Sequence, residues 1–106
     1  MSYRSPLDVR DAEALARSFI AEAGASERVE ASLDPRDGSL VITGRHGIGF
    51  FGTASFVPIR VGKTPTARSV AVAVARHVLE DPYSDERSVC ARAGELPLAL
   101  ALLLGV

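Results

Sequence analysis

Three motifs in the sequence contain residue types that do chemistry in other proteins. Residues 47–52 read Gly-Ile-Gly-Phe-Phe-Gly, which matches the glycine spacing of a dinucleotide-binding loop. That role requires a helix directly after the glycines, whereas residues 56–59 (Phe-Val-Pro-Ile) favour a strand. We therefore interpret these glycines as part of a hairpin or bulge that needs positive φ angles.

The second motif, Gly62-Lys63-Thr64, resembles the end of a nucleotide-binding P-loop. The full motif needs a glycine five residues earlier, where this chain has Val57, and Pro65 removes a main-chain N–H that would face phosphate. Two readings remain open. The segment is either a helix start whose bases, Lys63 and Arg68, hold an anion, or a capped helix with solvated charges.

The third motif is a cysteine with two histidines. Cys90 would be a nucleophile, with His77 or His46 as its base. The sequence has no third residue at a spacing that indicates it would orient the histidine. Zinc-type spacing is absent, and the acidic pairs at 80–81 and 85–86 are expected to be exposed. The sequence therefore predicts no catalytic site, no metal site and no cofactor, and we expect the protein not to be an enzyme.

Composition limits the remaining classes. The chain has 106 residues, of which 47% are hydrophobic and 24% charged, as in one globular domain spanning residues 1–106. It has no apolar run of membrane-spanning length, and its lone Cys90 fits a reducing cytoplasm. Eleven Arg against one Lys, 16 Ala and no Asn or Gln are typical of a GC-rich bacterial or phage genome.

Hydrophobic periodicity predicts an α+β fold. Two amphipathic helices flank a meander of three strands, so we expect a two-layer α-β-β-β-α domain with a three-stranded antiparallel sheet and an extra apolar C-terminal helix. Ser5 and Thr64 are the expected helix caps, residues 44–47 the expected second turn, and Gly52 and Pro58 make the third strand either long or broken. The expected elements are a helix at 6–23, strands at 28–34, 39–44 and 48–61, a helix at 65–80 and a helical segment at 95–104.

This order of elements resembles the double-stranded RNA-binding domain. In that family the second helix opens with a Gly-x-Ser-Lys-Lys-x-Ala-Lys pattern that contacts phosphates. This chain has Gly62, Lys63, Ala67 and Arg68 in that region, but Thr and Pro occupy the place of the lysine pair. The resemblance covers residues 5–80 in topology and implies weak phosphate binding at most, so we interpret it as shared topology and not as membership.

Charge is distributed unevenly, although the formal net charge is only −1. Residues 38–79 contain five bases and no acid, whereas both flanking segments are acidic. The block either steers an anionic partner or is neutralised when the acidic segments fold back. We expect four of its bases to bind a partner and not to support folding: Arg45, Arg60, Lys63 and Arg68.

Two functions from different classes follow. The first is a small non-catalytic interaction module, such as a regulator, inhibitor, immunity-type or accessory protein, that docks on a protein or a protein–nucleic acid complex. Its expected anchor is Phe50 or Phe51 flanked by Arg45 and Arg60, because a regular strand sends the two Phe side chains to opposite faces. The second is a nucleic-acid or anionic-ligand binder that uses residues 38–79, with weak nucleic-acid affinity.

The apolar C-terminal segment predicts self-association. Leu96–Leu104 has no polar face, and it is too short to cross a bilayer. We therefore expect a homodimer through this segment unless the domain buries it internally.

Overall fold

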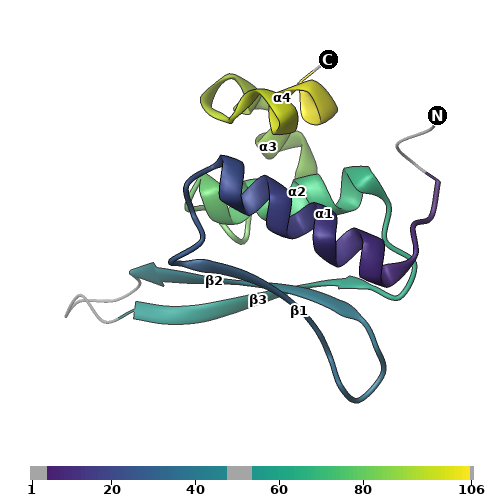
Figure 1. Cartoon of the computed structure of the whole chain (residues 1–106). Helices are drawn as coiled ribbons and strands as arrows, with labels where there is room; N and C mark the ends of the chain where they lie inside the picture. Colours follow the sequence, from purple (N-terminus) through teal and green to yellow (C-terminus); the bar gives the residue numbers. More distant parts are fainter. Residues whose placement is uncertain (1–4, 48–53, 106) are drawn as a thin grey trace.

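The computed structural model describes residues 5–47 and 54–105 and confirms the α+β fold (Figure 1). The helices and strands have these bounds: α1 Val9–Glu22, β1 Val29–Leu33, β2 Leu40–Gly47, β3 Ala54–Gly62, α2 Ala67–Val78, α3 Glu86–Ala91, the 3₁₀ helix η1 Ala93–Glu95, and α4 Leu98–Leu104.

The sheet is an antiparallel meander in the order β1-β2-β3. All described helices lie on one side of it, with α1 and α2 directly above the strands and α3 and α4 farther from them (Figure 1). The core lies between the sheet and the first helical layer. Its most deeply buried side chains are those of Ala12, Ala16, Leu40, Ile42, Val70 and Val74. The other face of the sheet carries no helix in the described part of the chain.

The first hairpin forms as the sequence predicts. Gly38 has a φ of 77°, and its N–H donates to the Asp34 carbonyl at 2.7 Å. Gly24, expected to end the first helix in a left-handed conformation, has a φ of 64°. The two structural roles of these glycines are confirmed.

Both long helices begin later than expected. Asp8 caps α1 by accepting from the Arg10 N–H at 3.3 Å, and Thr66 caps α2 by accepting from the Ser69 N–H at 3.0 Å. The expected caps Ser5 and Thr64 were wrong because the chain before each helix is extended. These two extended segments pair with one another, and the Leu7 N–H donates to the Pro65 carbonyl at 2.7 Å.

The predicted turn at residues 44–47 is also wrong, because β2 continues through Gly47. Gly44 occupies a helix-facing position of β2, and a Cβ added there would overlap the ring of His77. The glycine therefore permits a close approach between sheet and helix and does not mark a turn. The described part of the third strand begins at Ala54, and the expected start at residue 48 lies outside the described residues.

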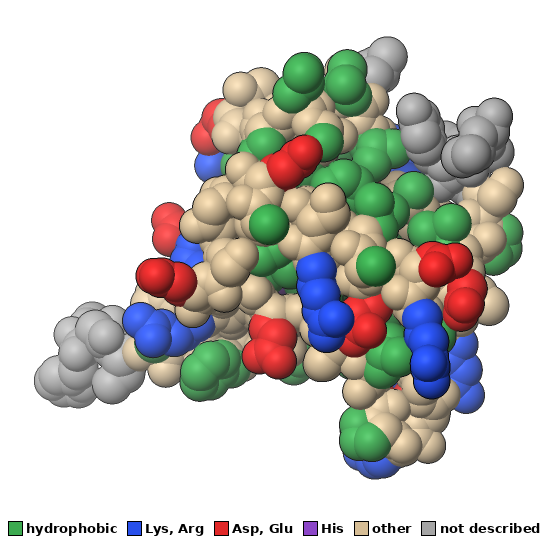
Figure 2. Space-filling view, viewed as in Figure 1, with side chains coloured by type: hydrophobic (Ala, Val, Ile, Leu, Met, Phe, Trp, Pro, Cys, Tyr) green, Lys and Arg blue, Asp and Glu red, His purple; other side chains and the backbone are tan. Residues whose placement is uncertain are grey.

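The C-terminal segment is two elements and not one helix. Pro97 separates η1 from α4, and the leucines divide between two environments. Leu100 and Leu104 are buried, whereas Leu98 and Leu102 are 73% and 59% exposed. In Figure 2 apolar side chains gather at the top of the view, over α4, and charges of both signs are interspersed below.

Candidate docking surface on the open face of the sheet

The open face of the sheet is built by period-two alternation along β2 and β3. Helix-facing positions such as Ile42 and Val57 are buried, and the residues between them point away from the helices. This outward set, which we call the open face, consists of Val41, Thr43 and Arg45 from β2 and Phe56, Pro58 and Arg60 from β3.

Phe56 is the most prominent apolar group on this face. Its side chain is 73% exposed, and its register partner on the neighbouring strand is Arg45. Directly opposed residues on antiparallel strands have Cβ atoms about 5 Å apart, so the aromatic ring and the guanidinium form one patch. Arg45 is exposed and forms no ion pair within residues 5–47 and 54–105.

A shallow hollow of about 180 Å³ adjoins this patch. Phe56, Arg45 and Thr43 form one wall, and the start of β1 forms the other with Arg28 and Glu30. An apolar ring beside a hollow with both charge signs at its rim is the composition of a protein contact site. It is a poor reaction site, because an open sheet face does not exclude water.

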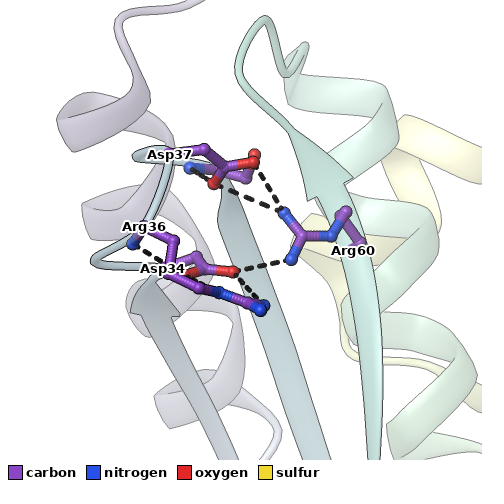
Figure 3. A network of polar contacts seen from close by, with 5 residues as sticks. Asp34, Arg36, Asp37 and Arg60 are labelled. Atoms are coloured by element: carbon purple, nitrogen blue, oxygen red, sulfur yellow. Dashed lines mark hydrogen bonds and ion pairs between the residues drawn. The ribbon is translucent and has the colours of Figure 1, made fainter.

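Arg60 lies on the same face but is committed to an internal network (Figure 3). Its Nη2 donates to Asp34 Oδ2 at 2.7 Å, and its Nη1 donates to Asp37 Oδ2 at 3.3 Å. Arg36 donates to the same Asp34 carboxylate at 3.0 Å, and the hydrogen bonds from Arg36 and then Arg60 hold the pKa of Asp34 far below its usual range. The acids of the first hairpin therefore neutralise one base of the 38–79 block.

Arg68 is likewise engaged within the chain. Its Nε donates to Glu86 at 3.1 Å, its Nη1 donates to the Leu103 carbonyl at 2.9 Å, and its Nη2 lies 3.4 Å from Cys90 Sγ. These contacts join α2 to both C-terminal helices. Lys63 is exposed ahead of α2 and has no ion pair among the described residues.

The predicted anchors Phe50 and Phe51 lie outside the described residues. The described open face has another aromatic side chain, Phe56, which lies opposite Arg45 and on the same strand as Arg60. The alternation of Val57, Ile59 and Val61 with Phe56, Pro58 and Arg60 was present in the sequence and would have placed this Phe. The pairing of Phe56 with Arg45 depends on the register of β2 against β3. This register was not predicted, because residues 44–47 were interpreted as a turn.

The histidines and the cysteine do not form one site. Cys90 contacts Arg68, while His46 and His77 lie together between the sheet and α2. Burial lowers the pKa of His77 to about 4 and also lowers that of His46, with the nearby Arg28 charge adding to both effects. Both rings are therefore neutral near pH 7, as core histidines and not as proton-transfer groups open to substrate.

Across residues 5–47 and 54–105, no three His, Cys, Asp or Glu side chains gather as a metal site would require. None of the helices described has the length and apolar character needed to span a bilayer. Comparisons with models of protein families, with curated proteins and with solved structures returned no match. The resemblance to the double-stranded RNA-binding domain consequently remains one of element order.

Proposed function

We propose that this protein is a small, non-catalytic interaction module that docks on a protein partner through the open face of its sheet. The observation that carries the proposal is the cross-strand pair of Phe56 and Arg45, an exposed aromatic ring beside a guanidinium that has no ion pair among the described residues. Aromatic and Arg side chains are the residue types enriched among energetically dominant interface contacts.

The energetics favour Phe56 as the centre of the contact. Burying a Phe side chain completely contributes roughly 1.5–3 kcal/mol, and this ring is almost fully available for burial. Pro58 and the half-buried Val41 extend the apolar surface along the two strands. A partner that covers them excludes water around the Arg45 charge and strengthens its pairing.

The partner's expected chemistry is an apolar pocket with a carboxylate at its edge. Arg45 supplies the complementary positive charge, while Arg60 is already paired with Asp34 and Asp37. The ion pairs of Arg60 with Asp34 and Asp37 support the first hairpin. They leave little free positive charge at the Arg60 end of the open face. The docking surface is therefore centred on the half of the sheet nearest Arg45.

The alternative, a nucleic-acid or anionic-ligand binder, has less support. Phosphate affinity grows with the number of bases free to contact the backbone, and two of the expected contacts are engaged internally. Arg45, Lys63 and Arg76 of the 38–79 block have no ion pair among the described residues. Three phosphate contacts give a salt dependence weaker than that of a nucleic-acid binder with about six or more.

The test is capture of partners from a lysate of the source cells, with and without nuclease. Wild type is compared with Phe56→Ser and with Leu98→Ser, a matched loss of an equally exposed apolar side chain on α4. We expect a protein that wild type and Leu98→Ser retain, that nuclease does not release and that Phe56→Ser fails to capture. Retention by Phe56→Ser, or release of every captured protein by nuclease, would contradict the proposal.

A further inference from the structure

A groove of about 280 Å³ lies between β3 and α2, on the helix side of the sheet. One stripe of α2, at the spacing i, i+3, i+4 and i+7, forms its helical wall. The strand contributes two half-buried apolar side chains that the helix does not fully cover. The full lining is Ile59, Arg60, Val61, Ser69, Val72, Ala73, Arg76 and Glu86. The Glu86 carboxylate is paired with Arg68 at 3.1 Å, which leaves Arg76 as the base of the lining without an ion pair among the described residues.

The strand that borders this groove is an edge of the sheet. β3 pairs only with β2 among the described strands, and none of the described side chains donates a hydrogen bond to its main chain. The opposite edge differs, because Arg17 Nη2 reaches the Ala31 carbonyl of β1 at 3.5 Å. Ile59 is the register partner of Ile42, so its main-chain groups face β2, and Pro58 lacks an N–H. Beside the groove, the main-chain N–H and C=O that face outward are those of Arg60.

Arg76 lines the groove from the last turns of α2, and its Nε is buried without a hydrogen-bond partner. A buried donor without an acceptor is unfavourable, and Arg side chains recognise carboxylates through paired N–H groups. No described acid forms an ion pair with Arg76. The nearby Asp85 is occupied as the cap of α3, where it accepts from the Ser88 N–H at 2.8 Å.

We propose that the groove binds an extended acidic peptide that adds to β3 as a fourth strand and places an Asp or Glu carboxylate on Arg76. Main-chain hydrogen bonds to Arg60 supply affinity, and the apolar wall of Val61 and Val72 selects an apolar side chain two residues from the acid. Arg60 borders both this groove and the open face, but neither Phe56 nor Arg45 lines the groove.

The probe is a displayed library of random ten-residue peptides selected on the full chain. We expect enrichment of sequences with one acid at a fixed distance from a β-branched residue. Arg76→Gln is expected to weaken binding of the strongest peptide at least tenfold, as measured by fluorescence polarisation. Arg87→Gln is the matched control, because Arg87 is an exposed base on α3 with no ion pair among the described residues.

The location of the peptide is read from amide chemical shifts and hydrogen exchange. The proposal requires new protection of the Arg60 amide, which faces outward from β3, and none along β1. Circular dichroism verifies that each variant folds, and Arg76→Lys, which keeps the charge but loses the planar fork, is expected to bind between wild type and Arg76→Gln.

Three results would overturn the proposal. Enriched peptides without an acid, or equal affinity for wild type and both Arg76 variants, would exclude the carboxylate contact. Protection on β1 in place of β3 would put the peptide at the other edge. Protection of the Arg60 amide that rises with the concentration of the chain alone would show that a second copy occupies the groove. None of these three results bears on docking through Phe56. The peptide groove and the docking surface can therefore be refuted independently.

Discussion

His46 Nε2 lies 2.8 Å from His77 Nδ1, and this buried hydrogen bond joins β2 to α2. The Ile42 carbonyl only accepts hydrogen bonds, so His77 Nε2, 2.8 Å from it, is the nitrogen that carries the proton. His77 Nδ1 is then an acceptor, and His46 Nε2 donates to it. If His77 took up a second proton, its Nδ1–H would face the Nε2–H of His46 with no acceptor between them. The same proton would place a positive charge in the core.

The first prediction concerns acid stability. His77 has an ordinary pKa of 6.5 and a folded pKa of about 4, so the unfolded chain takes up a proton first as the pH falls. The neutral form of His77 makes its full contribution to the free energy of unfolding above pH 6.5. This contribution, on the order of 3 kcal/mol, is lost as the pH falls from 6.5 to 4. Urea unfolding at several pH values measures this loss.

His77→Gln is the control for that titration. This variant is less stable than wild type at pH 7.5, and its stability is expected to change much less between pH 6.5 and 4. The acids with lowered pKa values, such as Asp37, lose their contribution only at lower pH. An equal pH dependence in wild type and variant would show that other groups dominate this range.

The second prediction concerns Gly44, which packs against the histidine pair. Gly44→Ala is expected to lower the free energy of unfolding by about 1–3 kcal/mol, because a Cβ would overlap the rigid His77 ring. Gly47→Ala, on the same strand, is the control because a Cβ there meets no atom of the described residues within 4 Å. A loss of the same size at both positions would indicate a general effect of strand glycines.

Gly44 also shows where sequence reasoning reached its limit. Alternation within residues 29–33 and 40–43 was enough to predict the first hairpin, because that pattern is local. The role of Gly44 is set by His77, which is far away in sequence. The local pattern of residues 44–47 predicted a turn because it contains no sign of that contact. The pairing of Arg60 with Asp34 and Asp37 depended in the same way on strand register.

The third prediction concerns self-association through α4. Leu100 and Leu104 are used internally, but Leu98 and Leu102 remain exposed beside a groove of about 360 Å³. We expect wild type to be dimeric at low micromolar concentration by light scattering, and Leu98→Ser/Leu102→Ser to be monomeric. Phe56→Ser is expected to remain dimeric, and a wild-type monomer near 11.2 kDa would refute this use of α4.

The fourth prediction separates two arginines on the open face. Arg60→Ala removes its bonds to Asp34 and Asp37, so we expect a small but measurable loss of stability, because exposed ion pairs are screened by solvent. Arg45→Ala is expected to change stability by less than about 0.5 kcal/mol, because no described acid pairs with it.

Hydrogen exchange locates the effect of each change. The Gly38 and Ser39 N–H groups donate within the hairpin, to the Asp34 carbonyl at 2.7 Å and to Asp37 Oδ1 at 2.9 Å. Faster exchange of both amides is expected in Arg60→Ala and not in Arg45→Ala, since only the former removes the bonds from β3 to the two carboxylates of the hairpin. Partner affinity should respond in the opposite order, falling more for Arg45→Ala because its charge is the one left for an interface. A stable Arg60→Ala with unchanged exchange, together with a destabilised Arg45→Ala, would reverse the assignment and make Arg60 the residue available to a partner.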